Sequence, residues 1–116
     1  IIRVAEEMRR DGVDFVIAAV HDGVDAAVSA AGRLEPDPRR MEDLCRAMRG
    51  RVDAVLGSHT LQRCVGVLAG VPFVQPWAFG AEVGVVELRP NQPPVAFGGM
   101  VEGSGAWDGP GSRMHA

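Results

Sequence analysis

Two histidines follow the two most strongly apolar segments of the chain. The stretch "FVIAAVHDG" places His21 directly after one β-branched run, and "AVLGSHTL" places His59 shortly after another. In open α/β sheets the carboxyl ends of parallel strands form the binding edge, and imidazole is a common ligand for Zn, Mn, Fe or Co. The spacing therefore predicts that His21 and His59 converge at one sheet edge and share one metal ion. The alternative interpretation is that each histidine merely completes a turn.

The elements that must position these histidines alternate between helix and strand. Segment 1–11 has apolar residues at helical spacing and ends before Gly12, and segment 38–49 follows the N-cap candidate Asp37 and stops at Gly50. Strands are expected near residues 14–20, 52–57, 64–68, 72–75, 82–89 and 95–101. This order favours an α/β fold, half of an α-β-β-α sandwich with a mixed sheet and both helices on one face.

Composition limits the classes of function. A chain of 116 residues with 47% hydrophobic content suits one domain, and a net charge of −3 with scattered arginines lacks the positive field that nucleic acid requires. Cys45 and Cys64 stand alone in apolar contexts, which predicts two buried thiols. Neither a membrane-spanning run nor a signal-peptide pattern is present, so we expect a soluble protein, cytoplasmic or exported, with no membrane partner.

The two ends of the chain carry different patterns. Ile1 stands within a helical pattern, which predicts that the upstream part of a longer helix is missing. We expect residues 1–103 to be part of one domain and the Gly- and Ser-rich residues 104–116 to be a flexible tail or linker, in which His115 is not a ligand. A chain that lacks part of its sandwich should expose an apolar sheet face or edge and therefore associate.

The order of the motifs resembles that of a known enzyme family. "GVDFVIAAVHDG", a helix, "VDAVLGSHT" and "GVPFVQPWAFGAEVGVVEL" are similar to the second half of a calcineurin-like metallophosphoesterase domain, in the 5′-nucleotidase and 2′,3′-cyclic-nucleotide phosphodiesterase branch. The resemblance covers about residues 3–90. It implies that His21 and His59 ligate the same divalent ion (Mn, Zn, Fe, Co or Mg) of a two-metal centre, and that Gly23 and Gly57 allow close backbone turns there. In such a centre a metal-activated hydroxide hydrolyses nucleotides or other small phosphate esters.

The sequence also departs from the family pattern. The second histidine of the family's Gly-His-x-His motif would fall at position 61, which is Leu61, so only one metal is expected to bind well. The family's Asp-x-His, Gly-Asp and Asn-His-Asp/Glu elements belong to the N-terminal half of the domain, which this segment would need as its partner. The segment alone is therefore expected to be inactive, without catalytic residues of its own.

Two other interpretations remain open. A degenerate domain could keep the fold as a scaffold or binding module, with His21 and His59 as remnants, and Leu61 favours that hypothesis. "GSHTLQ" also resembles the Gly-x-His segment of capsule-synthesis-type relatives in the same superfamily, although "VPFVQPWAFGAEVGVVEL" fits the nucleotidase branch better.

Several polar and aromatic residues flank the two histidines. Asp22 and Asp25 could orient the first histidine, or they could cap turns. Thr60 and Trp77 are the substrate-binding candidates, since a hydroxyl can donate to a phosphate oxygen and an indole can line a pocket. Phe79 is expected in the core.

Overall fold

A computed structural model describes residues 1–100 of the chain. The predicted tail at 104–116, with His115, and the last residue of the predicted strand 95–101 lie outside the described residues. In chain order the elements are α1 (Ile2–Arg10), β1 (Ile17–Ala19), β2 (Asp25–Val28), β3 (Leu34–Asp37), α2 (Arg39–Met48), β4 (Ala54–Leu56), β5 (Cys64–Leu68), β6 (Val71–Gln75), β7 (Glu82–Glu87) and β8 (Val95–Met100).

The central sheet has four strands in the order β1-β4-β6-β5. β1 and β4 run parallel, as do β4 and β6, while β5 pairs with β6 in the antiparallel direction. β2 with β3, and β7 with β8, form two separate antiparallel pairs. The predicted α/β class, with a mixed sheet and two helices, is therefore confirmed.

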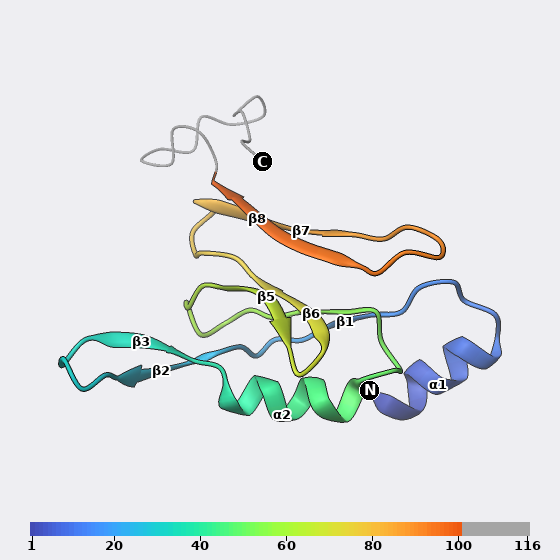
Figure 1. The fold of residues 1–116 in the computed structure, drawn as a ribbon, viewed down its shortest axis with the longest axis horizontal. Helices are drawn as coiled ribbons and strands as arrows, with labels where there is room; N and C mark the ends of the chain where they lie inside the picture. The colour runs from blue at the N-terminus through green and yellow to red at the C-terminus, as the bar shows by residue number, and fades with distance from the viewer. Residues whose placement is uncertain (101–116) are drawn as a thin grey trace.

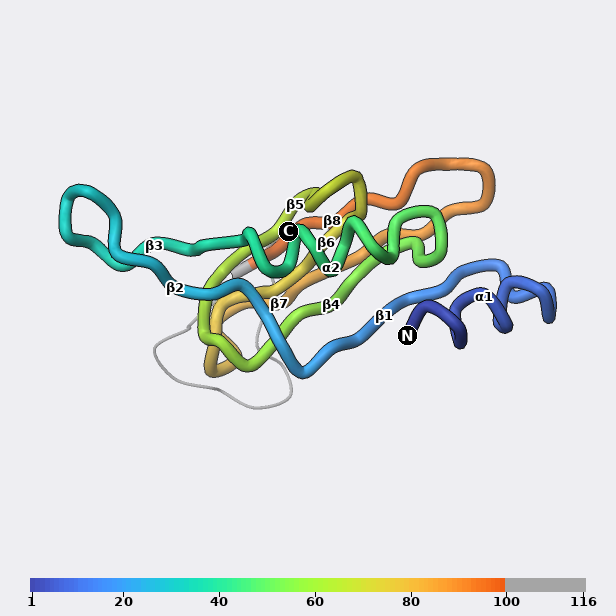
Figure 2. Tube along the Cα trace, turned by 90° about the horizontal axis from the view of Figure 1, so that it is seen from below, coloured from blue at the N-terminus to red at the C-terminus, as the bar shows by residue number. Residues whose placement is uncertain are grey.

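The elements are stacked in layers around the central sheet. Both helices lie on one side of this sheet, and the β7–β8 pair lies on the other, where it packs against β5 and β6 (Figure 1). Seen from the helix side, α2 crosses the middle of the sheet and α1 lies at the β1 end (Figure 2). Gly84 of β7 allows a close approach between the layers, because a Cβ there would overlap the Val74 side chain.

The core lies between α2 and the central sheet. Met41, Cys45 and Met48 recur at helical spacing and are almost completely buried, and they pack in one cluster with Val55 and Phe73 of the sheet. Burying the Phe73 side chain away from water contributes about 1.5–3 kcal/mol to the stability of the fold. α2 is therefore the element that fixes the helix layer to the sheet.

The β1 end of the sheet is less well covered. β1 is an edge strand among the described strands, and Ile17 and Leu56, on one face of the sheet, are each 37% exposed. α1 buries Ala5 but leaves Val4 and Met8 partly exposed. Apolar side chains are therefore partly exposed at this end of the sheet, and association of the chain stays a prediction.

Two differences from the predicted elements have local causes. The helices match within one residue at each end, but β1 and β4 are three-residue strands because regular pairing between them is confined to Ile17–Ala19 and Ala54–Leu56. The β2–β3 hairpin was not predicted, since β2 has two alanines and only one β-branched residue, and β3 has none and contains Pro36. Gly32, with φ of +72°, closes the hairpin turn by donating its N–H to the Ser29 carbonyl.

Within the described residues, neither helix is long and apolar enough to cross a membrane.

Candidate metal centre

The carboxyl ends of β1 and β4 bring the two predicted histidines together. The two strands pair directly, with Ala19 opposite Leu56, so the loops that follow them leave the sheet at the same edge. His21 lies on the first loop and His59 on the second, with ring centroids 4.6 Å apart and ring planes tilted by 46°. Both side chains are exposed. The predicted convergence at one sheet edge is thus present in the fold.

Ser58 joins these two loops to each other. Its N–H donates to the Asp22 carbonyl at 2.8 Å, and its hydroxyl donates to the Val20 carbonyl at 2.9 Å. Both acceptors flank His21, whereas Ser58 itself precedes His59. The two hydrogen bonds therefore hold the backbone of one histidine against the backbone of the other.

The backbone of the second loop adopts an uncommon conformation. His59 has a φ of +73° and Leu61 a φ of +55°, in the left-handed region that usually favours glycine. Each such residue costs on the order of 1–2 kcal/mol relative to ordinary backbone. Strained residues of this kind persist where the surrounding contacts determine the conformation, and they cluster at functional sites.

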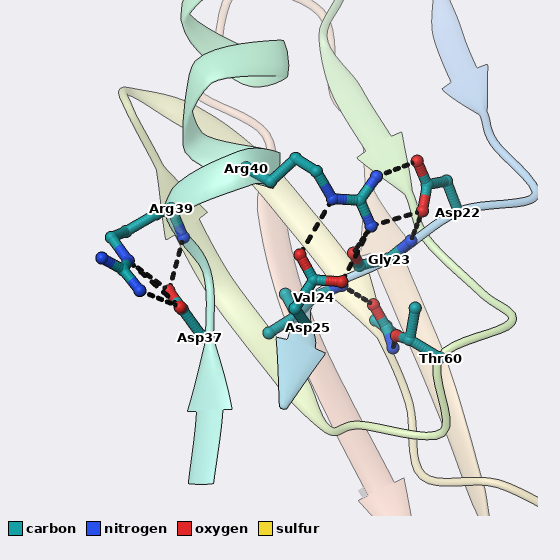
Figure 3. A network of polar contacts seen from close by, with 9 residues as sticks. Asp22, Gly23, Val24, Asp25, Asp37, Arg39, Arg40 and Thr60 are labelled. Carbon is teal, nitrogen blue, oxygen red and sulfur yellow. Dashed lines mark hydrogen bonds and ion pairs between the residues drawn. The ribbon is translucent and has the colours of Figure 1, made fainter. Parts of the chain in front are cut away.

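Arg40 fastens the first loop to α2. Its guanidinium donates to the Asp22 carboxylate, to both oxygens of Asp25 at 2.9 and 3.0 Å, and to the Gly23 carbonyl at 3.2 Å (Figure 3). The hydrogen bonds from Arg40 and then from the Gly23 N–H lower the pKa of the Asp22 carboxyl to about 2. Both carboxylates are occupied by Arg40, so the alternative in which they hydrogen-bond the imidazole of His21 is not the one observed.

Two glycines allow the loops to pack closely. A Cβ at Gly23 would overlap the Gln75 side-chain oxygen and lie 2.5 Å from the Ser58 carbonyl. A Cβ at Gly57 would lie 2.7 Å from the Phe73 ring. Neither glycine is among those with positive φ, so the close approach itself is what requires them.

A shallow recess lies on either side of the histidine pair. One, of about 280 Å³, is lined by Ala19, Val20, His21, Leu56, Gly57 and Ser58. The other, of about 200 Å³, is lined by Gly57, Ser58, His59, Leu61, Gln75, Pro76, Trp77 and Ala78. Apolar side chains make up much of both walls, so a bound molecule could contact imidazole and apolar surface at once.

Of the other residues singled out in the sequence, Trp77 and Thr60 lie near the histidines and Phe79 lies on the surface. Trp77 lines the recess beside His59 and is 47% exposed. Thr60 is half-buried on the same loop, and its hydroxyl accepts a hydrogen bond from the Gln75 amide at 2.8 Å. Phe79 was expected in the core, and that prediction is wrong: it is 93% exposed, with a φ of +61° that turns the loop outward.

A buried carboxylate anchors the loop that carries Trp77. The Glu82 side chain is 1% exposed, accepts a hydrogen bond from the Trp77 N–H at 2.7 Å, and pairs with Arg63 at 2.8 Å. Burial raises the pKa of Glu82, but the hydrogen bonds from Arg63 and the Trp77 N–H outweigh it, and the net shift is downward. The carboxylate therefore stays ionised and holds the wall of the recess to β5.

Three residues of this region were missed by the sequence analysis. Arg40 lies in a helix where its charge is unremarkable, and Ser58 is a common loop residue. Gln75 carried a usable signal, because a polar residue stands at the end of the apolar run "VPFVQ" in a buried strand. Its partners, however, lie on two distant loops.

The separation of the two imidazole rings can be compared with that of two ligands on one ion. With metal–nitrogen bonds of about 2.0–2.1 Å, two imidazoles on one ion have ring centres roughly 4.5–5.5 Å apart. The observed separation of 4.6 Å falls in that range. Among residues 1–100, no group of three or more His, Cys, Asp or Glu side chains could surround an ion. Two imidazoles are fewer than the three or four protein ligands of a typical zinc site, so His21 and His59 do not form a two-metal centre by themselves.

Comparison with known proteins found no family model, no curated protein and no solved structure that matches the chain.

Proposed function

We propose that the chain is the C-terminal half of a calcineurin-like metallophosphoesterase domain of the 5′-nucleotidase branch, and that His21 and His59 ligate one divalent metal ion. The observation that carries the proposal is the 4.6 Å separation of two exposed imidazoles at the carboxyl edge of paired parallel strands. A contact between two exposed histidine rings from distant loops adds little to the stability of the fold. Imidazole nitrogens, in contrast, are common metal ligands.

The layers of the fold support the same proposal. Helices, a mixed sheet and a second two-stranded sheet stacked in that order correspond to three of the four layers expected of an α-β-β-α sandwich. In the proposed assembly, the N-terminal half of the domain supplies the remaining ligands and the catalytic acid, and this segment alone is inactive.

The residues around the histidines would each contribute to binding a small phosphate ester, such as a nucleotide. A divalent ion bound there supplies Lewis acidity and lowers the pKa of water near phosphoryl oxygens. The Thr60 hydroxyl accepts from Gln75 and keeps its own proton to donate. Trp77 and Leu61 form an apolar wall beside His59, suited to the organic part of the ester.

A second candidate function rests on Leu61. Its side chain is 54% exposed and lines the recess beside His59, at the position where the resemblance expects another ligand. A leucine cannot coordinate a metal, and it makes the recess more apolar. The alternative proposal is a catalytically inactive scaffold that binds a partner or small molecule with this recess.

Metal titration of the chain distinguishes the two candidates. Zn²⁺ and Mn²⁺ binding would be measured by calorimetry, and Co²⁺ binding by visible absorption, for the unaltered chain, His21→Ala and His59→Ala. Each substitution should weaken binding by more than about tenfold, since even the loss of supporting partners weakens metal sites on that scale. The matched control is His115→Ala, the third histidine of the sequence. Binding that is absent, or that neither substitution weakens, would favour the scaffold.

A further inference from the structure

Gln75 is the buried polar side chain that lies between the two histidine loops. It ends β6 with 2% of its surface exposed, among residues that are otherwise apolar. A buried amide that lacked partners would cost about 1–3 kcal/mol, so its hydrogen bonds determine whether it is tolerated.

Both ends of the Gln75 amide are used, and each serves a different loop. Oε1 accepts the Val24 N–H at 2.8 Å, on the loop that follows His21. Nε2 donates to the Thr60 hydroxyl at 2.8 Å, directly after His59. Val24 and Thr60, the two residues that Gln75 joins, belong to different loops and are both labelled in Figure 3.

The Gln75 amide is closely packed against the two glycines of the histidine loops. The Gln75 oxygen fills the space that a side chain at Gly23 would need, and it lies 3.1 Å from where a Cβ at Gly57 would be. Arg40 contacts the first loop and not the second. Ser58 joins the backbones of the two loops at the exposed edge of the sheet. Gln75 therefore supports both loops from beneath.

We infer that Gln75 is a positioning residue that sets the separation of His21 and His59, and through it the affinity of the site for a metal ion. The inference rests on the proposed function where it concerns metal affinity. The separation of the two imidazoles is a property of the metal-free chain and can be measured independently.

The principal test replaces the amide by an apolar side chain of similar size. Gln75→Leu removes both hydrogen bonds, and Gln92→Leu, at an exposed glutamine of the β7–β8 turn, is the matched control. NMR contacts between the two imidazole rings would be recorded without metal, and Zn²⁺ affinity would be measured by calorimetry. Gln75→Leu should lose the ring contacts and bind Zn²⁺ more than about tenfold more weakly. Gln92→Leu should change neither.

A second pair of variants covers the case in which Gln75→Leu does not fold. Thr60→Val removes only the acceptor of the Gln75 amide hydrogen, and Thr60→Ser restores a hydroxyl at the same place. Thr60→Val should lose ring contacts and Zn²⁺ affinity, and Thr60→Ser should recover both. A purely structural role for the amide would lower the melting temperature without separating the rings.

The outcomes separate this inference from the proposed function. If the unaltered chain binds no Zn²⁺, the metal proposal fails, and the ring contacts alone decide the role of Gln75. If Zn²⁺ binds but the Gln75 and Thr60 variants keep both their ring contacts and an affinity within about twofold, Gln75 is not a positioning residue, while the metal proposal stands.

Discussion

The guanidinium of Arg40 donates a hydrogen bond to each carboxylate oxygen of Asp22, the residue that follows His21. Because the folded pKa of Asp22 is about 2, below its ordinary 3.8, the folded chain releases this proton more readily than the unfolded chain. The resulting stabilisation is fully present above about pH 4 and is lost as the pH falls through about 2.

This relationship predicts the outcome of a carboxyl titration by NMR. In Arg40→Lys the planar fork is lost, so the Asp22 midpoint should rise toward 3.8. Asp37, whose pKa is lowered to about 2 by hydrogen bonds from Arg39, is an internal control that should not move. An unchanged Asp22 midpoint would show that Arg40 does not determine the charge of this loop.

Leu61→His should add a ligand to the site. Leu61 already lines the recess beside His59, and its exposure leaves room for an imidazole. The resemblance assigns position 61 to the second metal, so in a protein that includes the N-terminal half of the domain this histidine should raise the bound metal, measured by elemental analysis, from one ion towards two. Leu61→Gln, which adds polarity without a strong zinc ligand, is the control. Equal metal content in the two variants would place residue 61 outside the metal centre.

Gly57→Ala should destabilise the fold because the added methyl group meets the Phe73 ring. The backbone cannot easily retreat, since the Gly57 N–H donates to the Val74 carbonyl at 2.9 Å. Overpacking of this kind costs about 1–3 kcal/mol in urea unfolding. Gly12→Ala, in open space at φ +85°, should show only the backbone cost of about 1 kcal/mol. A Gly57→Ala variant as stable as the unaltered chain would contradict the observed packing.

Glu82→Gln should loosen the loop that carries Trp77. The buried carboxylate is replaced by an amide that pairs less strongly with Arg63, and we expect a loss of about 1–3 kcal/mol in unfolding free energy. Trp77 emission, read in a Trp107→Phe background, should shift to the red. The control is Glu87→Gln, which breaks a more exposed pair with Arg89 and should cost less than about 0.5 kcal/mol.

The features that sequence patterns could predict are those with a local cause. The apolar stripe of α2, with Met41, Cys45 and Met48, predicts a helix and its buried face. The convergence of His21 and His59 could also be predicted, because strands joined through a helix usually run parallel and release their loops at one edge.

The features that could not be predicted depend on contacts between distant segments. The partners of Gln75 are a backbone amide at Val24 and a hydroxyl at Thr60, and no local pattern connects them. Phe79 has the apolar character of a core residue, but its side chain is exposed. It lies on the loop whose Trp77 N–H donates a hydrogen bond to the buried Glu82 carboxylate. Burial in both cases is decided by tertiary structure.

The left-handed backbone at His59 has a consequence for how this chain could change under selection. Glycine adopts a φ of +73° without steric cost, so His59→Gly should raise the melting temperature while removing the imidazole. A sequence shaped only by resistance to heat would therefore be expected to carry glycine at this position. The chain instead carries histidine there and bears the backbone cost that glycine would avoid.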